Sequence, residues 1–241
     1  MRKNRKAVIG IATACLLAVS GIWEAGKAVY TWSNGAGEKD NRFTVVVDPG
    51  HGGVDPGKVG INDVYEKEIN LSIALLLKEI LEQNDCRVIM TRTSDVGLYQ
   101  EGDSNKKMAD LRKRCQLIDE SKADVTVSIH QNSFSQESSK GAQVFYQTTS
   151  AAGKTLAELL QRQLISSLDE SNRRVAKANS DYYMLKNTKG VMVIVECGFL
   201  SNGEEAKLLT ESAYQRQVAW AIALGTLQFL EGVTETDTSA E

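Results

Sequence analysis

The sequence predicts an α/β fold: a single domain with a mostly parallel central sheet and helices on both of its faces. Short apolar runs rich in valine and isoleucine, typical of buried strands, alternate with longer segments of helical period. This alternation is typical of parallel sheets, because their crossover connections carry the helices. With 241 residues, of which 42% are hydrophobic and 24% charged, the chain is long enough to bury one substantial core.

The sequence divides into four predicted segments. Residues 1–25 combine a basic start with an uncharged apolar run, which indicates an N-terminal membrane anchor or a signal peptide. Because such a basic leader stays on the cytoplasmic side, the remainder is expected outside the cytoplasm. Residues 26–42, rich in Gly, Asn, Ser and Lys, are a predicted linker. Residues 43–231 form the predicted folded domain, and residues 232–241 a predicted disordered tail.

Charge and cysteine content narrow the class of protein. Four of the 28 basic residues lie in the first six positions, so the remainder has 24 basic and 31 acidic residues and a net charge of −7. This balance argues against nucleic acid as a partner. The four cysteines include no CxxC pair, and the three beyond the leader are predicted to be small buried apolar residues rather than disulfides or zinc ligands.

The predicted elements follow the hydrophobic pattern. Residues 66–83 have apolar side chains at 69, 73, 76, 77, 80 and 81, which is a helical period. Further helices are predicted over residues 109–121, 156–168, 204–209 and 214–230. Strands are predicted over residues 43–48, 87–91, 124–130, 142–147 and 191–195, with a short edge strand at 182–185. The basic residues between positions 106 and 114 are predicted to form a solvated face.

A long glycine-rich loop, residues 49–65, follows the first predicted strand. Pro49 and Gly50 end the strand, since proline cannot donate to the ladder and glycine permits a sharp turn. His51 therefore stands just past the carboxyl end of a strand, where open α/β sheets bind ligands. A loop of this length in a compact domain is usually functional.

The two histidines of the chain predict a metal centre. His51 follows one predicted strand, His130 ends another, and Glu66 opens the helix after the long loop. Two histidines and one carboxylate, with a fourth position open for water, make a catalytic zinc set. The alternatives are two structural histidines and, for Glu66, a carboxylate that only complements the start of its helix.

A second carboxylate, Glu196, follows the most apolar predicted strand. A carboxylate is costly to desolvate at the end of a buried strand, so this position indicates a functional role for Glu196. Beside a zinc-activated water, it would take a proton and pass it to a leaving nitrogen. The alternative is that Glu196 caps a turn at the following Cys197 and Gly198.

Two further polar residues are candidates for substrate binding. Arg92 follows the predicted strand 87–91 and could bind a substrate carboxylate or oxygen, although such arginines more often form structural ion pairs. Asn132, two residues past His130, could orient substrate or hold a turn. The loop 97–107 could cover or shape the site.

Taken together, these motifs resemble the zinc-dependent N-acetylmuramoyl-L-alanine amidases over roughly residues 43–231. The matching motifs, in order, are Asp-Pro-Gly-His-Gly-Gly at 48–53, Glu-Lys at 66–67, Thr-Arg at 91–92, Ser-Ile-His-Gln-Asn at 128–132 and Val-Glu-Cys-Gly-Phe-Leu-Ser-Asn at 195–202. The resemblance implies one zinc ion held by His51, Glu66 and His130, with Glu196 as the catalytic carboxylate. It also implies hydrolysis of the amide between the lactyl group of N-acetylmuramic acid and L-alanine of the stem peptide.

Within that family, the sequence is most similar to members that act on the spore cortex. The short leader, the insertion around residues 101–102 and the lack of a wall-binding repeat carry this similarity. It implies removal of stem peptides ahead of muramic-δ-lactam formation, in the space between the mother-cell and forespore membranes. The implied partners are peptidoglycan and, through residues 1–25, a membrane. Whether the protein needs an activating protein partner is a question that the sequence leaves open.

Two other functions are compatible with the same residues. A zinc carboxypeptidase acting on stem peptides would use the same ligands and base. A non-catalytic wall-binding module could retain a structural zinc. The products released from peptidoglycan distinguish these from the amidase.

Overall fold

The structure is a computed structural model, and it describes residues 42–232. The predictions for the leader, and for nearly all of the linker and of the tail, concern residues outside this range. Within residues 42–232, no helix is both long and apolar enough to cross a membrane.

A single six-stranded sheet organises the described residues, with strand order β2-β1-β3-β6-β4-β5. The strands are β1 (Phe43–Pro49), β2 (Cys86–Met90), β3 (Val125–Asn132), β4 (Gln143–Gln147), β5 (Lys177–Asn179) and β6 (Met192–Phe199). β2, β1, β3 and β6 run parallel to one another, whereas β4 runs antiparallel to β6 and parallel to β5. The predicted mostly parallel sheet is confirmed.

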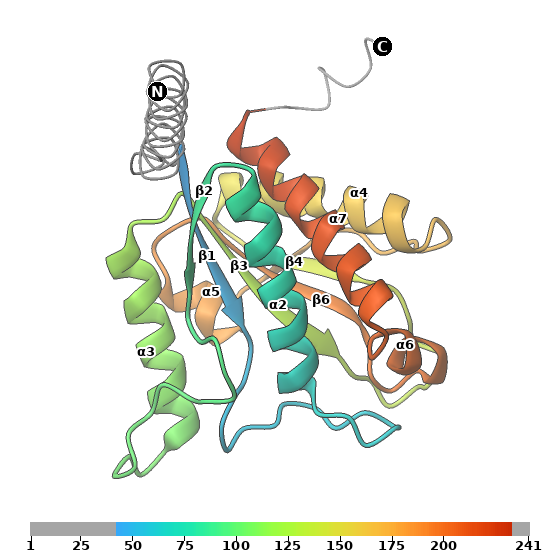
Figure 1. Cartoon of the computed structure of the whole chain (residues 1–241), viewed down its shortest axis with the longest axis horizontal. Helices are drawn as coiled ribbons and strands as arrows, with labels where there is room; N and C mark the ends of the chain where they lie inside the picture. Colours follow the sequence, from blue (N-terminus) through green and yellow to red (C-terminus); the bar gives the residue numbers. More distant parts are fainter. Residues whose placement is uncertain (1–41, 233–241) are drawn as a thin grey trace, which may run out of the picture. The chain divides into compact units, whose positions relative to one another are not determined.

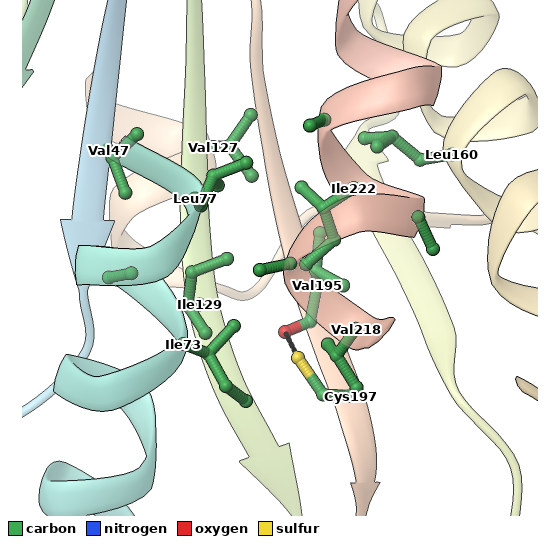
Figure 2. Packing of buried hydrophobic residues seen from close by; sticks show 14 of the residues in the cluster. Val47, Ile73, Leu77, Val127, Ile129, Leu160, Val195, Cys197, Val218 and Ile222 are labelled. Carbon is green, nitrogen blue, oxygen red and sulfur yellow. Dashed lines mark hydrogen bonds between the residues drawn. The ribbon is translucent and has the colours of Figure 1, made fainter. Parts of the chain in front are cut away.

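Three helices cover one face of the sheet and form the larger core (Figure 1). They are α2 (Glu66–Gln83), α4 (Ala151–Leu168) and α7 (Ser212–Leu230). Side chains such as Ile73 and Leu77 of α2 and Ile222 of α7 meet Val127 and Val195 of the strands (Figure 2). Each fully buried aliphatic side chain of this kind contributes about 1.5–3 kcal/mol.

Two helices cover the opposite face, so the prediction of helices on both faces is confirmed. These are α3 (Lys106–Ser121) and the short α5 (Tyr183–Asn187), which pack against the sheet through a smaller buried cluster. Cys115 and Ile118 of α3 and Met184 of α5 contribute to this cluster. A last short helix, α6 (Gly203–Leu208), follows β6. Cys86, Cys115 and Cys197 are free and buried, as predicted.

The edge strand predicted at residues 182–185 is wrong. That segment forms the start of α5, while the true edge strand, β5, lies in the preceding polar stretch. The adjacent residues Met184 and Leu185 are both buried in the same cluster. In a strand, adjacent side chains point to opposite faces of the sheet, so they could not share one cluster in this way. Asn179 ends β5 by accepting hydrogen bonds from the backbone N–H groups of Asp181 and Tyr182, each at 2.8 Å.

Two central strands also extend further than predicted. β3 runs to Asn132 and β6 to Phe199, so His130 and Glu196 lie inside strands rather than at their exits. The two residues face each other in the register of the parallel pair. The sheet therefore places the second histidine and the second carboxylate at the same level.

Candidate metal centre and active site

Four side chains from four elements meet at the carboxyl edge of the parallel strands. His51 follows β1, Glu66 is the first residue of α2, His130 lies on β3 and Glu196 on β6. All four line one pocket of about 500 Å³. The structure thus brings together all the side chains that the sequence analysis singled out for the metal and for proton transfer.

Glu66 stands between the two histidines. Its Oε2 lies 3.2 Å from Nε2 of His51, and its Oε1 lies 2.9 Å from Nδ1 of His130. One potential ligand atom from each residue falls within 4.8 Å of the others. The rings of His51 and His130 meet edge to face, with centroids 4.9 Å apart. Two imidazoles and a carboxylate at this spacing are the donor set that zinc prefers.

Glu66 is buried and ionised. A carboxylate that only complements the start of its helix would not need to be buried. Its side chain is 2% exposed, and it accepts backbone hydrogen bonds from Lys58 (2.8 Å) and Gln131 (3.1 Å). Burial raises the pKa of Glu66, but the hydrogen bonds and charges of His130 and His51 outweigh burial and hold this pKa far below its usual range. The contacts therefore contradict the alternative in which Glu66 only complements its helix.

His51 is oriented by a second carboxylate. Oδ2 of Asp55 lies 2.9 Å from Nδ1 of His51, so the two ring nitrogens face two different carboxylates. A carboxylate behind a histidine is the usual outer-shell partner of a metal ligand, because it sets the ring orientation and raises ligand basicity. Burial lowers the pKa of His51, but hydrogen bonds to Asp55 and Glu66 raise it to about 9.

Two glycines let these side chains approach the backbone. A Cβ on Gly50 would collide with the ring of His130, and a Cβ on Gly57 would lie 2.6 Å from Oε2 of Glu66 and 2.7 Å from Cδ2 of His51. Any larger residue would displace the histidines or the carboxylate. The observed donor set, the outer-shell Asp55 and this close backbone packing all fit a bound zinc ion.

Glu196 lines the pocket, and one of its oxygens, Oε2, is buried without a hydrogen-bond partner among the described residues. The side chain is 8% exposed, and its Oε1 accepts a hydrogen bond from the hydroxyl of Tyr182 at 3.4 Å. Burial raises the pKa of Glu196, although His130 partly offsets this. Because Glu196 lies within β6, the alternative in which it caps a turn at Cys197 is wrong.

The two candidate substrate-binding residues have different environments. Asn132 lines the pocket, where its Oδ1 accepts a hydrogen bond from the backbone of Ser133 at 2.8 Å. Arg92 is 3% exposed and donates to four backbone carbonyls, those of Pro49, Gly50, Ser94 and Lys67. The structure thus places Arg92 behind the His51 loop, as a support, and not among the residues that line the pocket.

A second arginine supports the same loop, and the sequence analysis missed it. Arg114 was expected on a solvated helix face, but it is 1% exposed. Its Nη1 donates to Oδ1 of Asp48 at 2.7 Å, its Nη2 donates to the carbonyl of His51 at 2.6 Å, and its Nε donates to Asp110 at 2.6 Å. The signal in the sequence was the i, i+4 pair of Asp110 and Arg114, which the basic run around it obscured.

The loop 97–107 shapes the site by packing against the His51 loop. The hydroxyl of Tyr99 accepts a hydrogen bond from the backbone of Val54 at 3.1 Å. At the end of the loop, Nζ of Lys107 lies 3.4 Å from Oδ2 of Asp55 and lines the pocket. The loop therefore packs against the His51 loop, and within residues 97–107 only Lys107, in the first turn of α3, lines the pocket.

Comparison with known proteins identifies the family to which the chain belongs. The Amidase_3 family, described as N-acetylmuramoyl-L-alanine amidase, matches residues 45–228. The germination-specific N-acetylmuramoyl-L-alanine amidase of Bacillus subtilis (strain 168) is 38% identical over 188 residues, which are 77% of this chain and 78% of that protein.

Solved structures agree with this assignment. The CwlD amidase from Clostridioides difficile, solved in complex with the GerS lipoprotein, superposes with a TM-score of 0.77 at 40% identity, over 79% of this chain and 99% of that chain. The catalytic domain of CwlV from Bacillus (Paenibacillus) polymyxa var. colistinus gives a TM-score of 0.69 at 32% identity, over 78% and 98% of the two chains.

The buried pair of Asp48 and Arg114 predicts a specific loss of stability in acid. Burial raises the pKa of Asp48, but Arg114, Ser128 and Thr91 together outweigh burial and lower the pKa to about 2, against 3.8 ordinarily. The unfolded chain therefore takes up this proton first as the pH falls. Stability from Asp48 should be complete above about pH 5 and should be lost towards pH 2, by about 2 kcal/mol. Urea unfolding of the full chain across this pH range measures the effect.

The matched variant is Asp48→Asn. It should lower the free energy of unfolding at pH 7 by about 3 kcal/mol, because Arg114 stays buried without its partner. The free energy of unfolding of this variant should also change less with pH in acid than that of the unchanged protein. Glu101→Gln, at an exposed position, should change neither quantity by more than about 0.5 kcal/mol. An acid dependence of Asp48→Asn equal to that of the unchanged protein would contradict the assignment.

Proposed function

The chain belongs to the N-acetylmuramoyl-L-alanine amidases, which act on peptidoglycan, and we propose that it works with one zinc ion and Glu196. His51, Glu66 and His130 would hold the zinc. The observation that carries this proposal is the convergence of these three ligand atoms within 4.8 Å, in the same pocket as a buried carboxylate.

Zinc bound there would supply a Lewis acid that polarises the amide carbonyl and acidifies water. The other tasks belong to the chain. Glu196 removes one proton from the attacking water and delivers it to the amide nitrogen of L-alanine as the C–N bond breaks. The hydroxyl from water ends on the carbonyl carbon. The products are the lactyl carboxylate of N-acetylmuramic acid and a stem peptide with a free amino terminus.

The remaining pocket residues would bind the stem peptide and position the scissile amide. Asn132 lies two residues beyond His130 in the wall of the pocket, within reach of an amide group there. Lys58 and Lys107 bring positive charge to the same wall. Stem peptides carry carboxylates, so these two lysines complement the charge of the substrate.

We also propose a role in spore-cortex maturation. The relatives named above include a germination-specific amidase, and the resemblance of the leader and the insertion at 101–102 agrees with it. The chain would remove stem peptides before muramic-δ-lactam forms, outside the cytoplasm between the mother-cell and forespore membranes. Residues 1–25 would attach it to a membrane or direct its export.

A protein partner is part of the same proposal. The CwlD amidase was solved in complex with the GerS lipoprotein, and that chain is 40% identical to this one. An extracytoplasmic lipoprotein would meet a membrane-attached amidase on the same surface. We propose such a lipoprotein as the partner.

Variants of the site separate the amidase from its two alternatives. With zinc, the full chain should release stem peptides with L-alanine amino termini from purified peptidoglycan. Glu196→Gln should lower kcat by about 10²–10⁴-fold and retain zinc, because the carboxylate moves protons without holding the metal. His51→Ala should lose both zinc and activity. Mass spectrometry of the digest and metal analysis of each variant measure these outcomes.

The control for these variants is Glu211→Gln, at an exposed position before α7, which should behave as the unchanged protein. Release of terminal D-amino acids in place of intact stem peptides would identify a carboxypeptidase instead. No hydrolysis by a zinc-loaded chain would favour the wall-binding module.

Zinc binding should release a proton. Because the pKa of His51 is raised to about 9, its imidazole is protonated at neutral pH. The ring must lose one proton before one of its nitrogens can coordinate a metal. The apparent affinity for zinc should therefore increase by up to about tenfold per pH unit between pH 6 and pH 8. Competition with a chromogenic chelator measures this slope. Asp55→Asn should reduce it, and an affinity independent of pH would argue against His51 as a ligand.

The cortex role is tested in the bacterium that carries the gene. Spores of a deletion strain should lack muramic-δ-lactam, and the unchanged chain, but not Glu196→Gln, should restore it. Muropeptide analysis of purified cortex gives the result. Normal lactam content in the deletion strain would refute the role. Affinity purification of the full chain from sporulating cells of the complemented strain tests whether a lipoprotein accompanies it.

A further inference from the structure

The catalytic carboxylate has one protein neighbour that the proposed mechanism does not use. The hydroxyl of Tyr182 donates to Oε1 of Glu196 at 3.4 Å, and no described residue contacts Oε2 by hydrogen bond. Tyr182 also lines the pocket beside Glu196. The two oxygens of the carboxylate are therefore not equivalent.

Tyr182 is held in place from two directions. Its ring packs edge to face against Phe145 of β4, with centroids 5.3 Å apart and an angle of 67° between the rings. Its backbone N–H donates to Oδ1 of Asn179 at 2.8 Å, at the turn between β5 and α5. A side chain with its ring and backbone both restrained can present a hydroxyl at a defined position.

The hydroxyl acts as a donor and keeps its proton. Burial, followed by the neighbouring charge of Glu196, raises the pKa of Tyr182 to about 12. At neutral pH the phenol is therefore protonated, and its hydroxyl donates to Oε1 of Glu196. The separation of 3.4 Å is longer than the roughly 2.5–3.0 Å usual for an O–H···O bond, and hydrogen bonds of catalytic groups are often long before substrate binds.

We infer that Tyr182 is a positioning residue for Glu196: its hydroxyl, held at Oε1, fixes the orientation of the carboxylate that exchanges protons with water and with the leaving nitrogen. This inference rests on the proposed function of Glu196. A carboxylate in a narrow pocket can rotate about its terminal torsion, which is broad and roughly two-fold. A donor fixed on one oxygen selects one orientation, and this reduces the reorganisation needed when the proton moves.

The test is Tyr182→Phe in the full chain, which keeps the ring and removes only the hydroxyl. With a soluble N-acetylmuramoyl peptide as substrate, kcat should fall about tenfold while KM changes by less than about twofold. Zinc content and melting temperature should match those of the unchanged protein. Tyr146→Phe is the matched control: it removes a phenol from the adjoining strand β4 on the opposite face of the sheet, and should leave kcat unchanged.

Three outcomes would overturn the inference. A raised KM with unchanged kcat would assign Tyr182 to substrate binding. Unchanged kinetics would show that the hydroxyl has no task, and a loss of activity that follows a loss of folded protein would make its role structural.

A second measurement ties the effect to Glu196. In the Glu196→Gln background, adding Tyr182→Phe should change the residual rate by less than about twofold, because the positioned group is already gone. A further tenfold loss there would show that Tyr182 acts independently. Failure of the proposed function is distinguishable, since it would appear as an unchanged rate in Glu196→Gln alone.

Discussion

The structure of the site depends on one buried carboxylate placed between two imidazoles. Glu66 is 2% exposed and lies 3.2 Å from Nε2 of His51 and 2.9 Å from Nδ1 of His130. A carboxylate in such a position is unfavourable unless its charge is compensated. The histidines and two backbone N–H groups provide that compensation here. A divalent cation held by these three side chains would add its positive charge to this compensation.

The neighbouring ion pair of Asp48 and Arg114 supports this centre from behind. Arg114 binds the Asp48 side chain and the carbonyls of Pro49 and His51, while Arg92 binds the carbonyls of Pro49 and Gly50. The two arginines thus supply donors to the backbone carbonyls of the loop that carries His51, and Asn70 supplies a further donor to Gly50. Such a pair adds little stability relative to apolar packing, but removing one partner is costly. Its contribution is the geometry of the loop, including the positive φ of 62° at His51.

Glu196 lines the same pocket as Glu66 but has a different electrostatic environment. Glu66 accepts several hydrogen bonds and stays ionised, whereas Glu196 accepts one and has its pKa raised by burial. Two carboxylates with pKa values displaced in opposite directions are suited to different tasks, one holding charge and the other exchanging protons. The parallel register of β3 and β6, which places His130 opposite Glu196, brings the two carboxylates into one pocket.

Local patterns were sufficient to predict most elements and the residues that converge. The bounds of α2 were predicted as Glu66–Gln83 because its apolar period is unbroken and the glycine-rich loop ends at its first turn. His51, Glu66 and His130 could be grouped in advance, since parallel strands deliver their carboxyl ends to one edge. The position of β5 and the supporting role of Arg92 followed no local pattern, and for the burial of Arg114 the one local signal was its i, i+4 spacing from Asp110. Arg114 meets Asp48 across 66 residues of sequence, and Tyr182 meets Glu196 only because β4, β5 and β6 lie side by side. The hydrophobic period along the chain thus determines the helices and strands, and it indicates the sheet edge at which the candidate ligands meet. The burial of single side chains and their hydrogen-bond partners depend on contacts between segments that are distant in sequence, and only tertiary packing selects those contacts.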